Sequence, residues 1–114
     1  MQLERERAKP LRAPLIIAVC CIVDAGARIP VIEQMLSAGA AAQNIMVAAN
    51  ALGYGSAWKT GEPAYDENVK RALGLEAKDA IVGFIYLGTR AQMTPPAQTV
   101  DPQQFVVEWP ASGG

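Results

Sequence analysis

Apolar residues are concentrated in two short runs and one long one. The first run, residues 14–23, reads PLIIAVCCIV and is continuously apolar instead of alternating with polar positions. A continuous run of this length, rich in β-branched residues, is typical of a strand buried on both faces in the middle of a sheet. The run at residues 80–87, AIVGFIYL, has the same composition and is closed by Gly88. The pattern therefore predicts two strands, the first of them central.

The long run extends from Val31 to Leu52 and predicts a helix. Pro30 suits the first position of a helix, and Gly53 suits its C-terminal cap. Its polar residues form only a narrow stripe, and a helix that is apolar nearly all round is expected to be buried. Small side chains, which allow a partner backbone to approach closely, make up much of the remainder: Ala38, Gly39, Ala40, Ala41, Ala42, Ala48, Ala49 and Ala51.

Shorter elements are predicted around these three. Residues 3–8 are good helix formers stopped by Pro10, and residues 65–73 fit a short helix ended by Gly74. Residues 89–104, with three prolines, predict an extended arm, and residues 105–109 (FVVEW) predict one more strand. An arm that ends in a strand can reach the sheet edge of a neighbouring subunit.

Composition and charge narrow the functional classes. Only 18% of the residues are charged while 51% are hydrophobic, so part of the surface is expected to be buried against another chain. A net charge of −1 provides no basic face for nucleic acid. Polar residues interrupt the stretch 31–52, which argues against a membrane span, and the charged N-terminus does not fit a secretory signal. We therefore expect a cytoplasmic protein.

The two cysteines, Cys20 and Cys21, are neighbours in the first predicted strand, so their side chains should point to opposite faces. The sequence contains no histidine to join them in a metal site, and both are expected to be apolar thiols. No paired carboxylates or catalytic triad can be recognised either. Any reaction would therefore belong to a bound cofactor, and no catalytic side chain is assigned.

Three segments carry a resemblance to a known family: Arg12–Val19 (RAPLIIAV), Met35–Gly61 (MLSAGAAAQNIMVAANALGYGSAWKTG) and Ala72–Thr89 (ALGLEAKDAIVGFIYLGT). Together they resemble the nitroreductase family, most closely its small bacterial YdjA-like branch. The resemblance implies an α+β sandwich with a central mixed sheet, in which residues 1–109 form the C-terminal part of a single domain and 110–114 a disordered tail. It also implies a homodimer, with the 31–52 helix in the interface and the C-terminal strand joined to the partner's sheet.

The resemblance places an FMN site at Trp58, Lys59, Thr60 and Gly61. A backbone N–H near the flavin N5 and a positive charge near its pyrimidine or phosphate end stabilise the reduced flavin. Gly61 lets the backbone approach, Trp58 could wall the ring, and Lys59 replaces an arginine of the relatives. If the resemblance is set aside, Trp58 can equally be interpreted as a packing residue, and Lys59 as an ordinary exposed lysine. The resemblance also brings a nicotinamide nucleotide to the end of the long helix, at Ala48, Ala49, Asn50, Ala51, Leu52 and Gly53.

Three functional hypotheses follow. The first is an oxidoreductase in which NAD(P)H reduces FMN and the flavin reduces a nitro-compound, quinone or similar small acceptor. The family also has an N-terminal Arg-Arg-Ser segment that holds the FMN phosphate and ribityl, and this sequence lacks it. The second hypothesis is therefore a non-enzymatic dimeric fragment with weak or no flavin binding. The third is a subunit completed by a separately encoded N-terminal half.

Overall fold

The computed structural model describes residues 13–90 and 98–111. The predicted helix end at residues 3–8, the Pro95–Pro96 part of the arm and the last three residues of the predicted tail lie outside the described residues. Within the described ranges, no helix is both long and apolar enough to cross a membrane.

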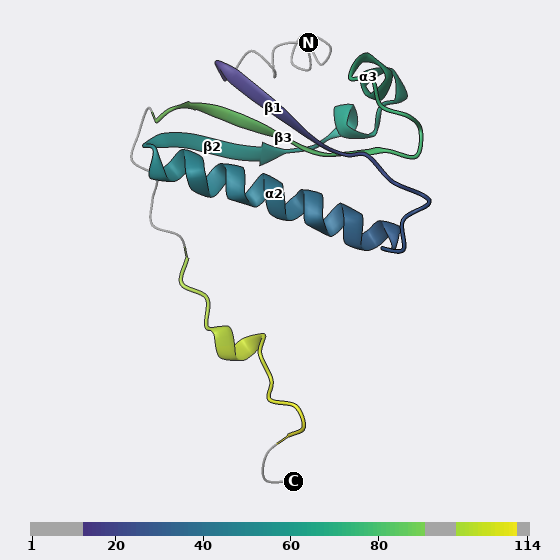
Figure 1. Cartoon of the computed structure of the whole chain (residues 1–114). Coiled ribbons are helices and arrows are strands. Elements are labelled where there is room, and N and C mark those ends of the chain that lie inside the picture. Colours follow the sequence, from purple (N-terminus) through teal and green to yellow (C-terminus); the bar gives the residue numbers. More distant parts are fainter. Residues whose placement is uncertain (1–12, 91–97, 112–114) are drawn as a thin grey trace.

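Among the described residues, three strands form one antiparallel sheet: β1 (Leu15–Cys21), β2 (Tyr54–Lys59) and β3 (Ala80–Thr89). Their order is β1-β3-β2, so β3 is the central strand and β1 lies at an edge (Figure 1). Both predicted strands are confirmed, but the central position expected for the first belongs to the second. β3, with ten residues, is the longest of these strands, and it pairs with β1 on one side and with β2 on the other.

The remaining strand, β2, is not among the elements that the sequence pattern predicts. Gly55, Ser56 and Lys59 are poor strand formers, so the local pattern is weak. The strand exists because it pairs along β3, from Tyr54 opposite Thr89 to Lys59 opposite Phe84. The strands described here are all antiparallel, where the resemblance implied a mixed sheet.

Helix α2 (Val31–Ala51) lies along one face of the sheet, as Figure 1 shows. The predicted helix is confirmed almost to the residue. Its buried residues are Ala42 and Ala49, seven positions apart and hence on one side of the helix. In the single chain the three-stranded sheet covers only one side of α2, so the expected burial of its other sides against a partner stays a prediction. Several large apolar residues elsewhere on α2 are exposed: Val31, Ile32, Leu36 and Val47.

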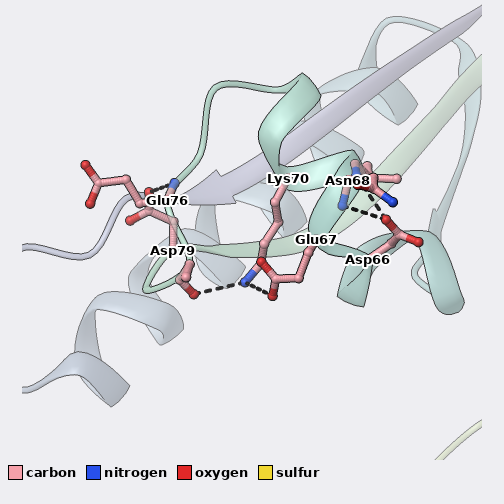
Figure 2. A network of polar contacts seen from close by, with 8 residues as sticks. Asp66, Glu67, Asn68, Lys70, Glu76 and Asp79 are labelled. Carbon is pink, nitrogen blue, oxygen red and sulfur yellow. Dashed lines mark hydrogen bonds and ion pairs between the residues drawn. The ribbon is translucent and has the colours of Figure 1, made fainter.

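The short helix predicted at residues 65–73 is present as α3 (Glu67–Ala72), preceded by the 3-10 helix η2 (Glu62–Tyr65). Asp66 caps α3, because its Oδ1 accepts hydrogen bonds from the backbone N–H groups of Asn68 and Val69 at 2.7 and 3.1 Å. Lys70 Nζ lies 3.8 Å from the Glu67 carboxylate and donates to the carbonyl of Ala77 at 3.2 Å (Figure 2). Side chains of α3 thus hold the loop that leads into β3.

Asp79 connects that loop to the end of β1. Its Oδ2 accepts a hydrogen bond from the Glu76 N–H at 2.8 Å, and its Oδ1 accepts one from the Val23 N–H at 2.9 Å. The residue is 4% exposed. The hydrogen bond from Glu76, and then that from Val23, lowers the pKa of Asp79, with burial acting against them. The carboxylate therefore stays ionised and joins two loops that are distant in sequence.

Gln34, in the first turns of α2, holds the preceding loop. Its Nε2 donates to the carbonyls of Asp24 and Ile29 at 3.1 and 2.9 Å, and its Oε1 accepts from the Asp24 N–H at 2.9 Å. Three bonds from one side chain thus fix the turn between β1 and the helix.

The cysteine pair adjoins an irregularity in the pairing of β1 with β3, where the register shifts between Val19 and Cys20. Both thiols are free; Cys21 is buried and Cys20 half-buried. Burial raises the pKa of Cys20, and the negative charge of Asp79 adds to the effect.

The C-terminal segment contains the short 3-10 helix η3 (Pro102–Gln104) and lies away from the sheet in Figure 1. The strand predicted at residues 105–109 is not formed in the single chain, since these residues pair with no strand in the described part of the chain. The apolar side chains of this segment are exposed: Phe105, Val106, Val107 and Trp109.

Candidate functional site

The four residues assigned to flavin follow one another across the end of β2. Trp58 and Lys59 are its last two residues, and Thr60 and Gly61 lead into η2. Gly61 has φ of 69°, a left-handed conformation that glycine adopts without strain. Its carbonyl accepts a hydrogen bond from the Ala64 N–H at 3.2 Å. The chain therefore reverses at Gly61, and Lys59, Thr60 and Gly61 are left exposed.

Trp58 points toward α2. It pairs with Ile85 in the ladder, and Ile85 is fully buried. The Trp58 indole Nε1 donates to the carbonyl of Val82 at 3.3 Å. On the helix side, a Cβ built on Gly39 of α2 would lie 3.9 Å from the indole Cη2. The indole thus lies between the sheet and the helix, and the packing interpretation describes its surroundings, although 38% of the residue remains exposed.

Lys59 points to the other face of the sheet, because successive side chains of a strand alternate. It pairs with Phe84, and its Nζ lies 5.9 Å from the centroid of the Tyr86 ring, two residues further along β3. That distance is at the outer limit of a cation–π contact. Among the described residues, no carboxylate forms an ion pair with Lys59. The ammonium group is therefore available to an anionic ligand on this face.

The segment assigned to the nicotinamide nucleotide covers the last turn of α2 and its cap. Ala49 is buried, whereas Ala48, Asn50, Ala51 and Leu52 are exposed. Gly53 ends the segment with φ of 90°. An additional contact fixes its position, since the Asn50 Oδ1 accepts a hydrogen bond from the guanidinium of Arg90, just after β3. This end of the helix is thereby tied to the sheet.

The two assigned segments lie at opposite ends of β2. Gly53 immediately precedes Tyr54, and Thr60 immediately follows Lys59. Six strand residues at about 3.3 Å each separate them by roughly 20 Å. One chain therefore does not bring the two segments together, and a ligand that touches both needs that length or a second copy of the chain.

Sequence reasoning missed three residues around these segments: Gly83, Tyr86 and Arg90. Gly83 offered a signal, because a glycine inside a run of large apolar strand residues often marks a close approach of another group. Tyr86 and Arg90 gave none. Their partners, Lys59 and Asn50, are distant in sequence and meet them only through strand pairing and helix packing.

Known proteins resemble this chain over most of its length. Residues 2–89 match the model of the Nitroreductase family. The chain is 37% identical, over 105 residues, to the Escherichia coli (strain K12) protein named "Putative NAD(P)H nitroreductase YdjA", covering 91% of this chain and 57% of that protein. The chain thus spans little more than half the length of the curated relatives that it matches.

Solved structures share the fold. A nitroreductase-like family protein from Bacillus cereus superposes with a TM-score of 0.72 at 24% identity, over 91% of this chain and 58% of that one. A protein from Clostridium difficile R20291 named FMN-dependent nitroreductase superposes with a TM-score of 0.61 at 22% identity, over 81% and 56% of the two chains. At these identities the likeness concerns the fold. Because the family match covers most of the chain and the E. coli relative agrees with it, this chain belongs to the nitroreductase family.

Proposed function

We propose that this chain forms part of an FMN-dependent NAD(P)H oxidoreductase of nitroreductase type. Its acceptors would be nitro-compounds, quinones or similar small molecules. The family match and the names of its relatives support the class of reaction. The observation that carries the proposal is the exposed end of β2, where Lys59, Thr60 and Gly61 offer a cation and a reversing backbone on one side of the sheet.

The residues present fit a flavin in their chemistry. The Lys59 ammonium has no carboxylate partner in the described residues and faces away from α2, so it can stabilise an anionic phosphate or a reduced pyrimidine ring. The backbone N–H groups at Thr60 and Gly61 are the donors for the N5 edge, and the left-handed Gly61 allows a close approach. Trp58 belongs to the site through its backbone, since its indole packs toward α2. Bound flavin would supply the hydride chemistry.

The exposed end of α2 is proposed to receive the nicotinamide nucleotide. Most residues of this segment have small or short side chains and leave room for a flat ring near the backbone: Ala48, Asn50, Ala51 and Gly53. Leu52 is the larger, exposed exception. Ala49, which is 7% exposed, is buried on the opposite side of this helix end. The Arg90 contact to Asn50 keeps this helix end fixed on the sheet.

A homodimer is proposed through α2 and the C-terminal arm. The single chain leaves large apolar side chains exposed on both: Ile32, Leu36 and Val47 on the helix, and Phe105, Val107 and Trp109 on the arm. A second copy would remove this apolar surface from water, at about 25 cal/mol per Å². It would also give residues 105–109 the ladder partner that a strand needs.

A second candidate is a dimeric protein that binds flavin weakly or not at all. The Trp58 indole favours it, because the ring packs toward α2 and lies on the face of the sheet away from Lys59. Completion by a separately encoded N-terminal half is the corresponding third candidate.

Flavin binding separates these candidates. The purified full-length chain is examined for flavin absorbance, then titrated with FMN and assayed for NADPH oxidation with a nitroaromatic acceptor. Copurified or titrated FMN together with acceptor-dependent NADPH oxidation supports the enzyme. A colourless dimer that takes up no FMN supports the second candidate, and FMN uptake only after mixing with a relative's N-terminal segment supports the third.

A further inference from the structure

We infer that Gly83 is a positioning residue for the flavin-binding end of β2, acting through the indole of Trp58. The inference rests on the proposed function and deepens it. It concerns a residue on the face of the sheet away from Lys59, in a strand that carries none of the four residues assigned to the flavin.

The contact between the two residues is unusually close. A Cβ built on Gly83 would lie 2.0 Å from the Trp58 Nε1, 2.5 Å from its Cδ1 and 3.0 Å from its Cε2. Side-chain carbons do not approach other heavy atoms so closely, so only glycine leaves room for the indole here. The adjacent carbonyl of Val82 accepts the indole N–H at 3.3 Å, which orients the ring across Gly83.

The indole lies between β3 and α2. On the side of the helix it faces Gly39, where a built Cβ would lie 3.9 Å from the indole Cη2. A methyl group at position 83 would displace the ring and its hydrogen bond to the carbonyl of Val82. An added methyl that forces a side chain out of its place also shifts the backbone that carries it. The first backbone affected is that of Trp58, directly before Lys59 and Thr60.

The consequence is a geometric link between a buried glycine and an exposed ligand site. Lys59 and the reversing backbone at Gly61 extend from the strand end that the indole holds in place. A binding site that is loosened by a fraction of an ångström loses affinity even when all of its contacting groups are retained. Gly83 thus determines the position of those groups without touching the ligand.

A double-mutant cycle tests this on the full chain, with variants Gly83→Ala, Trp58→Ala and Gly83→Ala/Trp58→Ala. The dissociation constant of FMN is measured by flavin fluorescence, and folding by circular dichroism. We expect Gly83→Ala to raise the FMN dissociation constant about tenfold, the scale of one overpacked methyl group. In the Trp58→Ala background the same change should have no further effect, because no indole is left to displace.

Gly39→Ala is the matched control. It adds the same methyl group beside the same indole, but at an ordinary contact distance of 3.9 Å, so FMN affinity should stay within about twofold of wild type. If Gly83→Ala does not fold, the double variant should recover folding, since the overlap is gone. Additive effects of the two substitutions on FMN affinity, or a double variant that does not recover folding, would overturn the inference. A wild-type chain without FMN binding contradicts the proposed function instead, and is recognised before any variant is compared.

Discussion

Trp58 and Lys59 are neighbours in β2, and their side chains lie on opposite faces of the sheet, one against α2 and one near Tyr86. The alternation of a strand makes this unavoidable once the two residues belong to β2. A flavin on the Lys59 face is therefore separated from the Trp58 indole by the sheet. The two residues act differently in the proposed site, one by charge and one by packing.

Replacing Lys59 tests the charge. We expect Lys59→Ala to raise the FMN dissociation constant by about tenfold or more, the usual value of a lost charge-assisted hydrogen bond. Lys59→Arg keeps the charge and should retain most of the affinity. Lys78→Ala removes another exposed lysine, which pairs with Glu76 at 3.7 Å, and serves as the control. Equal FMN titrations for Lys59→Ala and wild type would remove Lys59 from the site.

The proposed dimer can be tested at Leu36, which is 66% exposed on α2 in the single chain. Leu36→Glu would place an unpaired charge in an apolar interface and weaken association by about 3 kcal/mol or more. Sedimentation should then show a monomer at concentrations where the wild type is dimeric. Ala77→Glu adds the same charge in an exposed loop and should leave the dimer intact. A dimer that persists in Leu36→Glu would exclude this face of α2 from the contact.

Gln34, half-buried near the start of α2, should contribute measurably to stability. Gln34→Ala removes all three hydrogen bonds to the loop at residues 24–29. We expect the free energy of unfolding to fall by about 1–2 kcal/mol in urea denaturation. Gln43→Ala, at an exposed position of the same helix, should stay within about 0.5 kcal/mol of wild type. A similar small change in both variants would show that the loop does not depend on Gln34.

We expect the contribution of Asp79 to the free energy of unfolding to decrease at acid pH. Its pKa is lowered in the folded chain, first by the Glu76 hydrogen bond and then by that from Val23. Its stabilising effect is therefore fully present above the ordinary aspartate pKa of about 3.9, and is lost as pH falls toward the lowered folded value. Asp79→Asn should be less stable than wild type at pH 7, with a difference that shrinks below about pH 3.9. Thermal unfolding across pH 2–7 measures this, and a constant difference would contradict it.

The sequence pattern located the strands at residues 14–23 and 80–87 and the helix from Val31, because each is a largely apolar segment of the length typical of its element. It failed where an element depends on a partner. β2 contains Gly55, Ser56 and Lys59 and forms only by pairing with β3. Residues 105–109 have the composition of a strand and remain irregular, since they pair with no strand in the described part of the chain.

The same division holds for the site. The resemblance of the segment ending in Gly61 suggested residues for a flavin site, and Gly61 adopts a left-handed conformation that suits a close approach. The sequence could not show that Trp58 and Lys59 face opposite ways, because that follows from strand β2, which the sequence did not predict.

By itself, the sequence determined the apolar elements and the family, since both depend on residues that are adjacent or regularly spaced along the chain. Only the tertiary structure decided which strand is central and which face of the sheet Lys59 occupies. It also showed that the Trp58 indole leaves no room for a Cβ at Gly83. Those features arise from contacts between residues far apart in sequence, such as Trp58 with Val82 and Asn50 with Arg90. Such contacts exist only once the strands have paired and α2 has packed against them.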